Sequence, residues 1–430
     1  MPATSSLLPP NPIRAALVAI VCWALLASGC APASFAAEIV VAEGGLDLAA
    51  ALEAAEPGDV IVLEHGVHRG PVRLDVRLSL IGRGGVIDGG GEGSSVVVAA
   101  PGVRVEHLAI RNSGEDVGAS DACIYVEPSA TGAVLRGNTL SECAFGVWVH
   151  ETEGVVIEAN RISSRKDVRE GDRGNGIHLF DASKLVVRGN HVEIARDGIY
   201  VSATEDSLIA DNETSKVRFG IHYMYSYGNE IRGNVANDNK VGLALMESHD
   251  LVVEDNVAMR NKRMGLLFRD VEDSQVRRNH LEANGNGMFF FSSARNVVED
   301  NVIVGNEMGL KVWAGTKDNV ISGNVIRGNR QQVFYVASED QIWGEDGRGN
   351  HWSDYLGWDQ DGDGVGDRPH RVDSFTANLL YRYPAAVLLM RSPALETLAH
   401  LSDLMPILRT PTVIDVAPLT KDPSREEPVR

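Results

Sequence analysis

Short runs of alternating apolar and polar residues recur along most of the chain, separated by Gly-Asn or Asp-Asn pairs. One set of asparagines is spaced by 22 or 23 residues apart from a single gap of 30: 138, 160, 190, 212, 234, 256, 279, 301 and 324. A set of marker glycines keeps the same step: 146, 176, 198, 220, 242, 265, 287 and 309. Self-similarity at such a period indicates a solenoid.

Each repeat holds short alternating strands, and Asn and Gly tolerate the left-handed conformation that a corner needs. The 3.6-residue periodicity of a helical solenoid is missing. We therefore expect an all-β right-handed parallel β-helix over residues 38–345, with about 22 residues per turn. Residues 45–56 are rich in Ala and Leu and predict a capping helix, after which Val60 begins the first strand. The charged residues 163–173 fill the long gap and predict a loop.

The strand after each marker glycine separates into an inner and an outer face. Its first and third residues are apolar in every repeat and should point into the core, as in Val147/Val149 and Leu243/Leu245. The outer positions carry aromatic, His and Met side chains where bland polar residues would be expected. We expect them to form a partner-binding face: Trp148, His150, His178, Phe180, Tyr200, Phe289, Phe291 and Trp313.

Three interpretations of this face stay open on residues alone. Aromatic stripes bind sugars by stacking, whereas thioether and imidazole ligands select Cu(I). The best copper candidates are His222, Met224 and Met246, because the two methionines share a column on adjacent turns. The third interpretation is that the C-terminal tail or a partner protein covers the face.

An enzyme would need paired carboxylates. Glu247 and Asp270, with Arg269 beside them, form the best pair, but charged residues at strand ends are usually only solvated. We therefore expect no catalytic residues and no enzyme activity.

Residues 346–378 are rich in Asp and Gly. Asp359, Asp361, Asp363 and Asp367 occupy positions 1, 3, 5 and 9 of a calcium-type loop, with Gly364 at position 6. Position 12 is His370 instead of the usual Glu. The pattern predicts a Ca²⁺ site, and an Asp-Gly turn without an ion is the alternative.

Residues 379–419 predict an amphipathic helical tail. One side carries Leu395, Leu398, Leu401, Met405 and Leu408. Such a helix either caps the solenoid or docks on a membrane-bound partner. Residues 420–430 are rich in Pro and charge and predict a disordered end.

Residues 1–37 predict a secretory signal peptide, in which Arg14 precedes a short apolar run from Ala15 to Leu26. Cleavage after Ala36 or Ala37 is favoured over a lipid anchor on Cys30, and both imply export.

Of the four cysteines, only Cys123 and Cys143 then certainly remain in the mature chain. Two separately buried thiols are favoured over one disulfide, because the repeat places the two residues out of step. The net charge of −19 argues against nucleic-acid binding.

The chain resembles the NosD family, the periplasmic maturation factors of nitrous oxide reductase. The resemblance rests on the solenoid with residues 220–226 (GIHYMYS), the stretch from Trp352 to Asp367, and the tail residues 380–384 (LYRYP) and 391–396 (RSPALE). It implies the periplasmic part of an ABC-type complex with a cytoplasmic ATPase and a permease-like membrane subunit. That complex assembles the copper–sulfide centre of the reductase, with a copper chaperone lipoprotein as metal donor.

On this resemblance the chain itself hydrolyses nothing, and ATPase activity belongs to a partner subunit. The aromatic face becomes the docking surface for chaperone or reductase, and the Leu395–Leu408 helix contacts the membrane subunit. Copper in transit and calcium are the only cofactors expected. A carbohydrate-binding or polysaccharide-cleaving β-helix is the alternative function.

Overall fold

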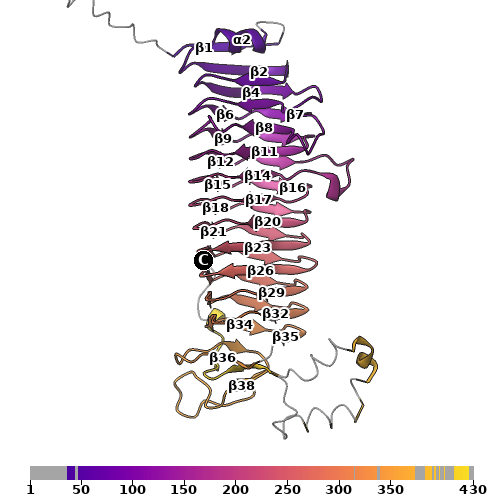
Figure 1. Ribbon diagram of the computed structural model, residues 1–430, viewed down its shortest axis with the longest axis vertical. Helices are drawn as coiled ribbons and strands as arrows, with labels where there is room; N and C mark the ends of the chain where they lie inside the picture. Colours follow the sequence, from indigo (N-terminus) through magenta and orange to yellow (C-terminus); the bar gives the residue numbers. More distant parts are fainter. Residues whose placement is uncertain are drawn as a thin grey trace, which may run out of the picture. The chain divides into compact units, whose positions relative to one another are not determined.

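The computed structural model describes residues 36–43, 47–313, 315–336, 339–372, 383–389, 392, 393, 397, 401 and 411–425. From Glu38 onward the chain winds into a stack of parallel strands (Figure 1). These strands form two large sheets, one of 24 strands and one of 12. Strands in successive turns pair in parallel about 22 residues apart, as in Ile221 with Leu243. The expected right-handed parallel β-helix is confirmed.

The larger sheet begins with the long strands of the first turns and continues as two stacks of short strands. Its opening strands are β1 (Glu38–Val41), β2 (Val60–Arg69) and β4 (Ser79–Asp88). The first stack contains β6 (Arg104–Glu106), β9 (Val134–Arg136), β12 (Val156–Glu158), β15 (Val186–Arg188), β18 (Leu208–Ala210), β21 (Glu230–Arg232), β24 (Val252–Glu254), β27 (Gln275–Arg277), β30 (Val297–Glu299) and β33 (Val320–Ser322). The second contains β7 (Ala109–Arg111), β10 (Thr139–Ser141), β13 (Arg161–Ser163), β16 (His191–Glu193), β19 (Glu213–Ser215), β22 (Val235–Asn237), β25 (Val257–Met259), β28 (His280–Glu282), β31 (Val302–Val304), β34 (Val325–Arg327) and β37 (His351–Trp352).

The 12-stranded sheet carries the marker glycines, and we call it the second sheet. Its strands are β3 (Val72–Leu74), β5 (Val96–Val98), β8 (Ala122–Val126), β11 (Phe145–His150), β14 (Ile177–Phe180), β17 (Ile199–Ser202), β20 (Phe219–Met224), β23 (Val241–His249), β26 (Met264–Glu272), β29 (Asn286–Phe291), β32 (Met308–Val312) and β35 (Gln331–Tyr335). Its inward residues form the core: Leu243 and Leu245 are fully buried, and Phe268 stacks on Phe290 at 5.0 Å between ring centres.

The marker asparagines are buried and bonded to one another along the solenoid. Asn256 Nδ2 donates to Asn279 Oδ1 (2.9 Å) and to the carbonyl of Ile231 (2.8 Å), while Asn256 Oδ1 accepts from Asn234 Nδ2 (2.9 Å). Every donor and acceptor at this buried corner is thereby satisfied, which explains why the spacing is kept so strictly.

The marker glycines are required because neighbouring turns approach closely. A Cβ on Gly242 would lie 2.5 Å from the carbonyl oxygen of Gly265 and 2.9 Å from the Ala258 methyl carbon. No side chain fits between them without moving the backbone.

Helix α2 (Leu48–Ala54) lies at the N-terminal end of the stack, as expected for a cap, and buries Leu48 and Ala51 (Figure 1). It is shorter than the predicted 45–56. Strand β1 precedes the helix and pairs with β2, so Val60 begins the second strand of the fold and not the first.

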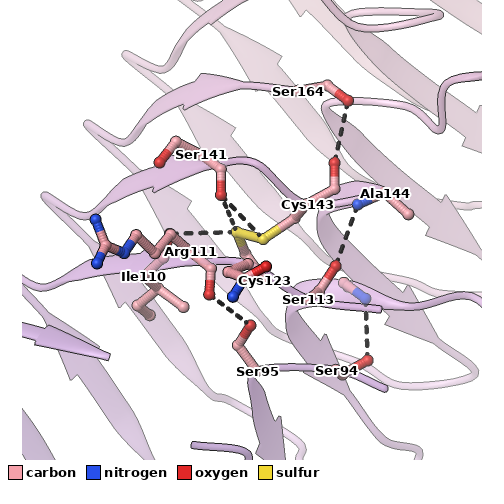
Figure 2. The surroundings of a disulfide bond; sticks show 12 residues. Ser94, Ser95, Ile110, Arg111, Ser113, Cys123, Ser141, Cys143, Ala144 and Ser164 are labelled. Carbon is pink, nitrogen blue, oxygen red and sulfur yellow. Dashed lines mark hydrogen bonds between the residues drawn. A yellow bond between two sulfur atoms is a disulfide. The ribbon is translucent and has the colours of Figure 1, made fainter. Parts of the chain in front are cut away.

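Cys123 and Cys143 form a disulfide, which corrects the expectation of two separate thiols (Figure 2). Cys123 lies in β8, whereas Cys143 lies in the corner just before β11. Because that corner turns the Cys143 side chain inward, two cysteines that are out of step in the repeat still meet, with their Cα atoms 5.5 Å apart.

A small third sheet closes the C-terminal end of the solenoid. It contains β36 (Gln341–Trp343), β38 (His370–Arg371) and β39 (Val413–Asp415). Two predictions are wrong here: residues 411–419 form a strand and its return instead of a helical tail, and residues 420–425 are ordered and end in the short helix η4 (Pro423–Arg425). The reason is that Val413 and Asp415 are fully buried against residues of the last turns.

Two further helical segments are η1 (Glu170–Asp172) and η2 (Pro384–Leu389). Helix η1 lies in the predicted loop, which protrudes between β13 and β14 (Figure 1). Glu170 in this loop forms an ion pair with Lys240 at 2.8 Å. The signal peptide lies outside the described residues apart from positions 36 and 37. Among the described helices, none is long and apolar enough to cross a membrane.

Candidate functional site

The outer face of the second sheet carries three columns of side chains. They come from the residue before each marker glycine and from the second and fourth residues after it. The middle column runs Trp148, His178, Tyr200, His222, Ala244, Leu267, Phe289, Lys311 and Phe334. The fourth-residue column includes Met224, Met246, Arg269 and Phe291.

In the first half of this face, rings from successive turns contact one another. Trp148 and His178 lie 3.7 Å apart between ring centres, His178 and Tyr200 4.7 Å, and Tyr200 and His222 4.8 Å. Burial lowers the pKa of His178 to about 3, so this imidazole is neutral at physiological pH.

The other predicted members of the face lie at its margins. The hydroxyl of Tyr125 lies 2.9 Å from His150 Nδ1, and the Phe180 side chain is 38% exposed. This half of the face is therefore a continuous aromatic surface with one projecting ring.

Asp197 fixes the orientation of His222. It lies in the column of residues that precede the marker glycines, directly before Gly198. Its buried carboxylate accepts hydrogen bonds from His222 Nδ1 at 3.0 Å and from Arg218 Nη2 at 2.6 Å. Burial by itself would raise the pKa of Asp197, but the hydrogen bonds from Arg218 and His222 outweigh it, and the pKa is lowered. Since an ionised carboxylate only accepts, Nδ1 carries a proton, and the lone pair of the corresponding neutral tautomer lies on Nε2.

His222 Nε2 is buried and has no hydrogen-bond partner among the described residues. Met224 follows two residues later on the same outer face, and Met246 is its direct neighbour on the next turn. Both methionine side chains are half-buried. The three predicted copper ligands thus occupy neighbouring register positions on the outer face, which is not fully exposed there, since His222 is only 7% exposed.

A groove follows on the next turns, with a volume of about 490 Å³. We call it the apolar groove; it is lined by Phe219, Val241, Met246, Arg263, Met264, Leu267, Arg269, Phe289, Phe291, Lys311 and Trp313. Val241, Ala244, Met264 and Leu267 pack beneath it as a second apolar cluster, outside the solenoid core. The outer face is therefore not exposed throughout, since Ala244 is fully buried and Leu267 is 8% exposed.

The column before the marker glycines is the part of the site that the sequence analysis missed. It supplies Asp197, the carboxylate that orients His222. It also supplies Phe219, Val241 and Met264, which form one wall of the groove. The signal was present, because these residues precede the glycines at the same 22- or 23-residue step. Strand alternation applied only after each glycine could not reveal it.

The best carboxylate pair for catalysis is not set apart by its surroundings. Glu247 and Asp270 follow the paired residues Met246 and Arg269 on adjacent turns, both with positive φ angles. Asp270 lies 3.6 Å from Arg269 across an ion pair that is about half-exposed. Both residues lie within β23 and β26 and not at strand ends, and both are half-buried.

The predicted calcium loop brings three of its four carboxylates together. Oxygens of Asp359, Asp361 and Asp363 lie within 4.8 Å of one another. Asp367 accepts a hydrogen bond from the Gln360 amide instead, and His370 packs on Trp352 at 4.8 Å between ring centres. The tail residues Leu395, Leu398, Met405 and Leu408 lie outside the described residues, while Leu401 is helical and 39% exposed.

Comparison with known proteins gives a family. Residues 158–357 match the family described as "Periplasmic copper-binding protein (NosD)". A "Probable ABC transporter binding protein NosD" of Pseudomonas aeruginosa is 39% identical over 80% of this chain and 83% of its own length. A protein of the same description from Stutzerimonas stutzeri is 37% identical over 80% of this chain and 82% of its own.

Among solved structures, the family 28 exopolygalacturonase of Yersinia enterocolitica superposes with a TM-score of 0.54 at 11% identity, over 73% of this chain and 77% of that one. This likeness concerns the β-helix alone. The two relatives, by contrast, match over 80% of this chain at an identity that shows common descent. The chain belongs to the NosD family.

Proposed function

We propose that this chain is a periplasmic accessory protein of an ABC-type complex that assembles the copper–sulfide centre of nitrous oxide reductase. It acts as a docking scaffold for the reductase and for a copper chaperone lipoprotein. ATP hydrolysis belongs to the ATPase subunit, which works with a permease-like membrane subunit. The names of the relatives, an ABC transporter binding protein and a periplasmic copper-binding family, support this proposal.

The observation that carries the copper part is the His222–Asp197 pair beside two methionines. A carboxylate on one ring nitrogen sets the tautomer and leaves the other nitrogen free as a ligand, an arrangement frequent at metal sites. Thioethers at Met224 and Met246 add the soft ligands that Cu(I) prefers. Copper is cargo in this proposal and passes through His222, Met224 and Met246.

The docking part of the proposal uses the whole outer face of the second sheet. Trp148, His178 and Tyr200 give a rigid aromatic surface, and Phe289, Phe291 and Trp313 border the apolar groove. Aromatic, Met and Arg side chains are enriched in protein interfaces. The residues Leu395, Leu398, Leu401, Met405 and Leu408 are proposed to contact the membrane subunit, and Asp359, Asp361, Asp363 and Asp367 to hold Ca²⁺.

The alternative, a carbohydrate-binding or polysaccharide-cleaving β-helix, rests on the aromatic face. It predicts affinity for soluble oligosaccharides and independence of any partner.

The deciding experiment deletes the gene in the native host under denitrifying conditions and measures nitrous oxide together with copper per reductase. We expect the gas to accumulate and the reductase to lack its copper–sulfide centre. A normal reductase would refute the maturation role.

Complementation then tests the copper path. The triple variant His222→Ala, Met224→Ala, Met246→Ala should fold, by circular dichroism and melting temperature, and yet leave the reductase copper-poor. Tyr225→Ala serves as the control, because this ring is 48% exposed and adjoins Met224 in sequence. Unchanged copper per reductase in the triple variant would remove the proposed site.

A further inference from the structure

The charge at the apolar groove is opposite in sign to the net charge of the molecule. The chain carries a net charge of −19, yet the charged residues that line the groove are all cationic: Arg263, Arg269 and Lys311. None of the lining residues is an Asp or a Glu. An acidic protein that gathers cations around an apolar depression presents a surface complementary to an anionic apolar partner.

Lys311 shows the imbalance most clearly. Its ammonium lies 4.8 Å from the Phe289 ring centre and 4.6 Å from that of Trp313, and no ion pair to it exists among the described residues. Burial, followed by repulsion from Arg263, lowers the pKa of Lys311. The ammonium is therefore held over aromatic faces without a counter-charge.

Arg263 has no ion pair among the described side chains either, whereas Arg269 lies 3.6 Å from Asp270. Two of the three cations thus have no carboxylate partner within the described solenoid. An external carboxylate near both would relieve their mutual repulsion.

The floor and walls of the groove define the apolar component. Leu267 and Met264 are each 8% exposed and form the floor, while the half-buried Met246, Phe289 and Phe291 stand around it. A depression of about 490 Å³ accommodates a few apolar side chains. Its Met and aromatic walls are typical of surfaces that take up another protein.

We propose that the apolar groove binds a partner-protein segment in which a few apolar side chains are flanked by Asp or Glu. The apolar side chains pack on Leu267 between Phe289 and Phe291, and the flanking carboxylates pair with Arg263 and Lys311. This proposal deepens the docking role and rests on it, since the reductase and the chaperone are the partners there.

Three short synthetic peptides with the same Leu-Met-Phe-Leu centre and flanks of Glu, Gln or Lys test the chemistry. The full mature chain should bind the Glu peptide about 10-fold more tightly than the Lys peptide at low salt. The preference should shrink as salt is raised. The double variant Arg263→Glu, Lys311→Glu should invert the order, and Phe289→Ser should weaken all three.

Matched controls separate the groove from general surface effects. Arg330→Glu changes a cation that is 81% exposed, and Val320→Ser changes an apolar side chain that is 46% exposed on the other sheet. Both should keep the wild-type order. Equal binding of the three peptides, or an order that the double variant leaves unchanged, would overturn the proposal. Self-association of the wild-type chain that the double variant abolishes would assign the groove to a second copy and would also overturn it.

The same variants in the gene-deletion strain separate this inference from the proposed function. If the wild-type chain discriminates between the peptides but Phe289→Ser gives normal copper per reductase, the groove chemistry stands and reductase maturation does not use the groove. If Phe289→Ser gives a copper-poor reductase but the wild-type chain does not discriminate between the peptides, the maturation role stands and the proposed groove chemistry is wrong.

Discussion

His222 Nδ1 donates to Asp197 Oδ2 at 3.0 Å, between adjacent turns of the solenoid. Arg218 approaches the same carboxylate from the turn of His222 and lies 4.5 Å above the Phe219 ring. One buried charge therefore orients a histidine and anchors an arginine on the outer surface of a β-helix, where solvation would normally make such a network unnecessary.

Asp197→Asn should destabilise the chain and reduce copper delivery together. The variant leaves Arg218 half-buried without its counter-charge, which should lower the free energy of unfolding by about 3 kcal/mol. It should also release the His222 ring and lower copper per reductase. Urea denaturation and metal analysis measure the two effects, and Asp238→Asn, in an ion pair about half-exposed, is the control.

The pH dependence of the same variant identifies the charge as the cause. Because the folded state lowers the pKa of Asp197, its stabilising contribution is complete above the unfolded pKa of about 3.9. The contribution is lost as pH falls through the lower pKa of the folded state. The stability gap between wild type and Asp197→Asn should therefore narrow below about pH 4. A constant gap would point to packing instead of charge.

Asn256→Ala should cost about 2 kcal/mol, because the neighbours of Asn256 lose buried hydrogen bonds that water cannot replace. Asn286→Ala is the matched control, since the half-buried Asn286 side chain is outside the asparagine ladder. Thermal and urea unfolding compare the two. Equal stability of both variants would mean that the ladder contributes no more than a surface amide.

Gly242→Ala and Gly305→Ala test two different reasons for glycine. The first places a methyl group 2.5 Å from a carbonyl oxygen and should cost about 3 kcal/mol. The second meets no atom within 4 Å but has φ +64°, and it should cost about 1 kcal/mol. The reverse order of melting temperatures would contradict the close-approach explanation.

Cys123→Ser together with Cys143→Ser should lower stability by about 3 kcal/mol, the value typical of a loop of this length. The sequence separation is 20 residues, and both side chains are buried. The mature wild-type chain, cut after Ala37, should show no reactive thiol when unfolded without reductant. Detection of two thiols per chain would contradict the disulfide.

Calcium should raise the melting temperature of the chain, and a chelator should reverse the shift. Asp361→Asn with Asp363→Asn should abolish the response, because these carboxylates lie with Asp359 in one cluster. Asp318→Asn, an exposed carboxylate on another turn, should keep it. An identical response of both variants would place calcium elsewhere.

The β-helix was predictable because its structure repeats. Each turn contacts the turn before it and the turn after it, so the marker positions 234 and 242 meet the same requirements as their counterparts one repeat away. The inward residues, such as Leu243, follow from alternation for the same reason. Fold, period and core were therefore readable from a single sequence.

The unpredicted features depend on contacts that do not repeat. The Cys123–Cys143 disulfide depends on how one corner turns, and strand β39 pairs with β36 from about 70 residues away. The apolar groove depends on the sizes of side chains from different turns, since the small Ala244 lies in one apolar cluster against which Phe219 and Phe289 pack. Such features follow from three-dimensional packing and not from a period.

The asparagine ladder has a direction and an end. Each amide donates to the next turn, until Asn350 donates to Asp415 Oδ2, an oxygen that also accepts from Trp352 Nε1 and ends the series of amide donors. A whole turn inserted within the ladder would keep every partner matched and would lengthen the molecule by roughly 4.8 Å. An asparagine stacked beyond Asp415 would need a donor for its amide oxygen and would meet an acceptor. The number of turns inside the ladder can therefore change without loss of hydrogen bonds, whereas the C-terminal end of the ladder is fixed by the Asp415 side chain.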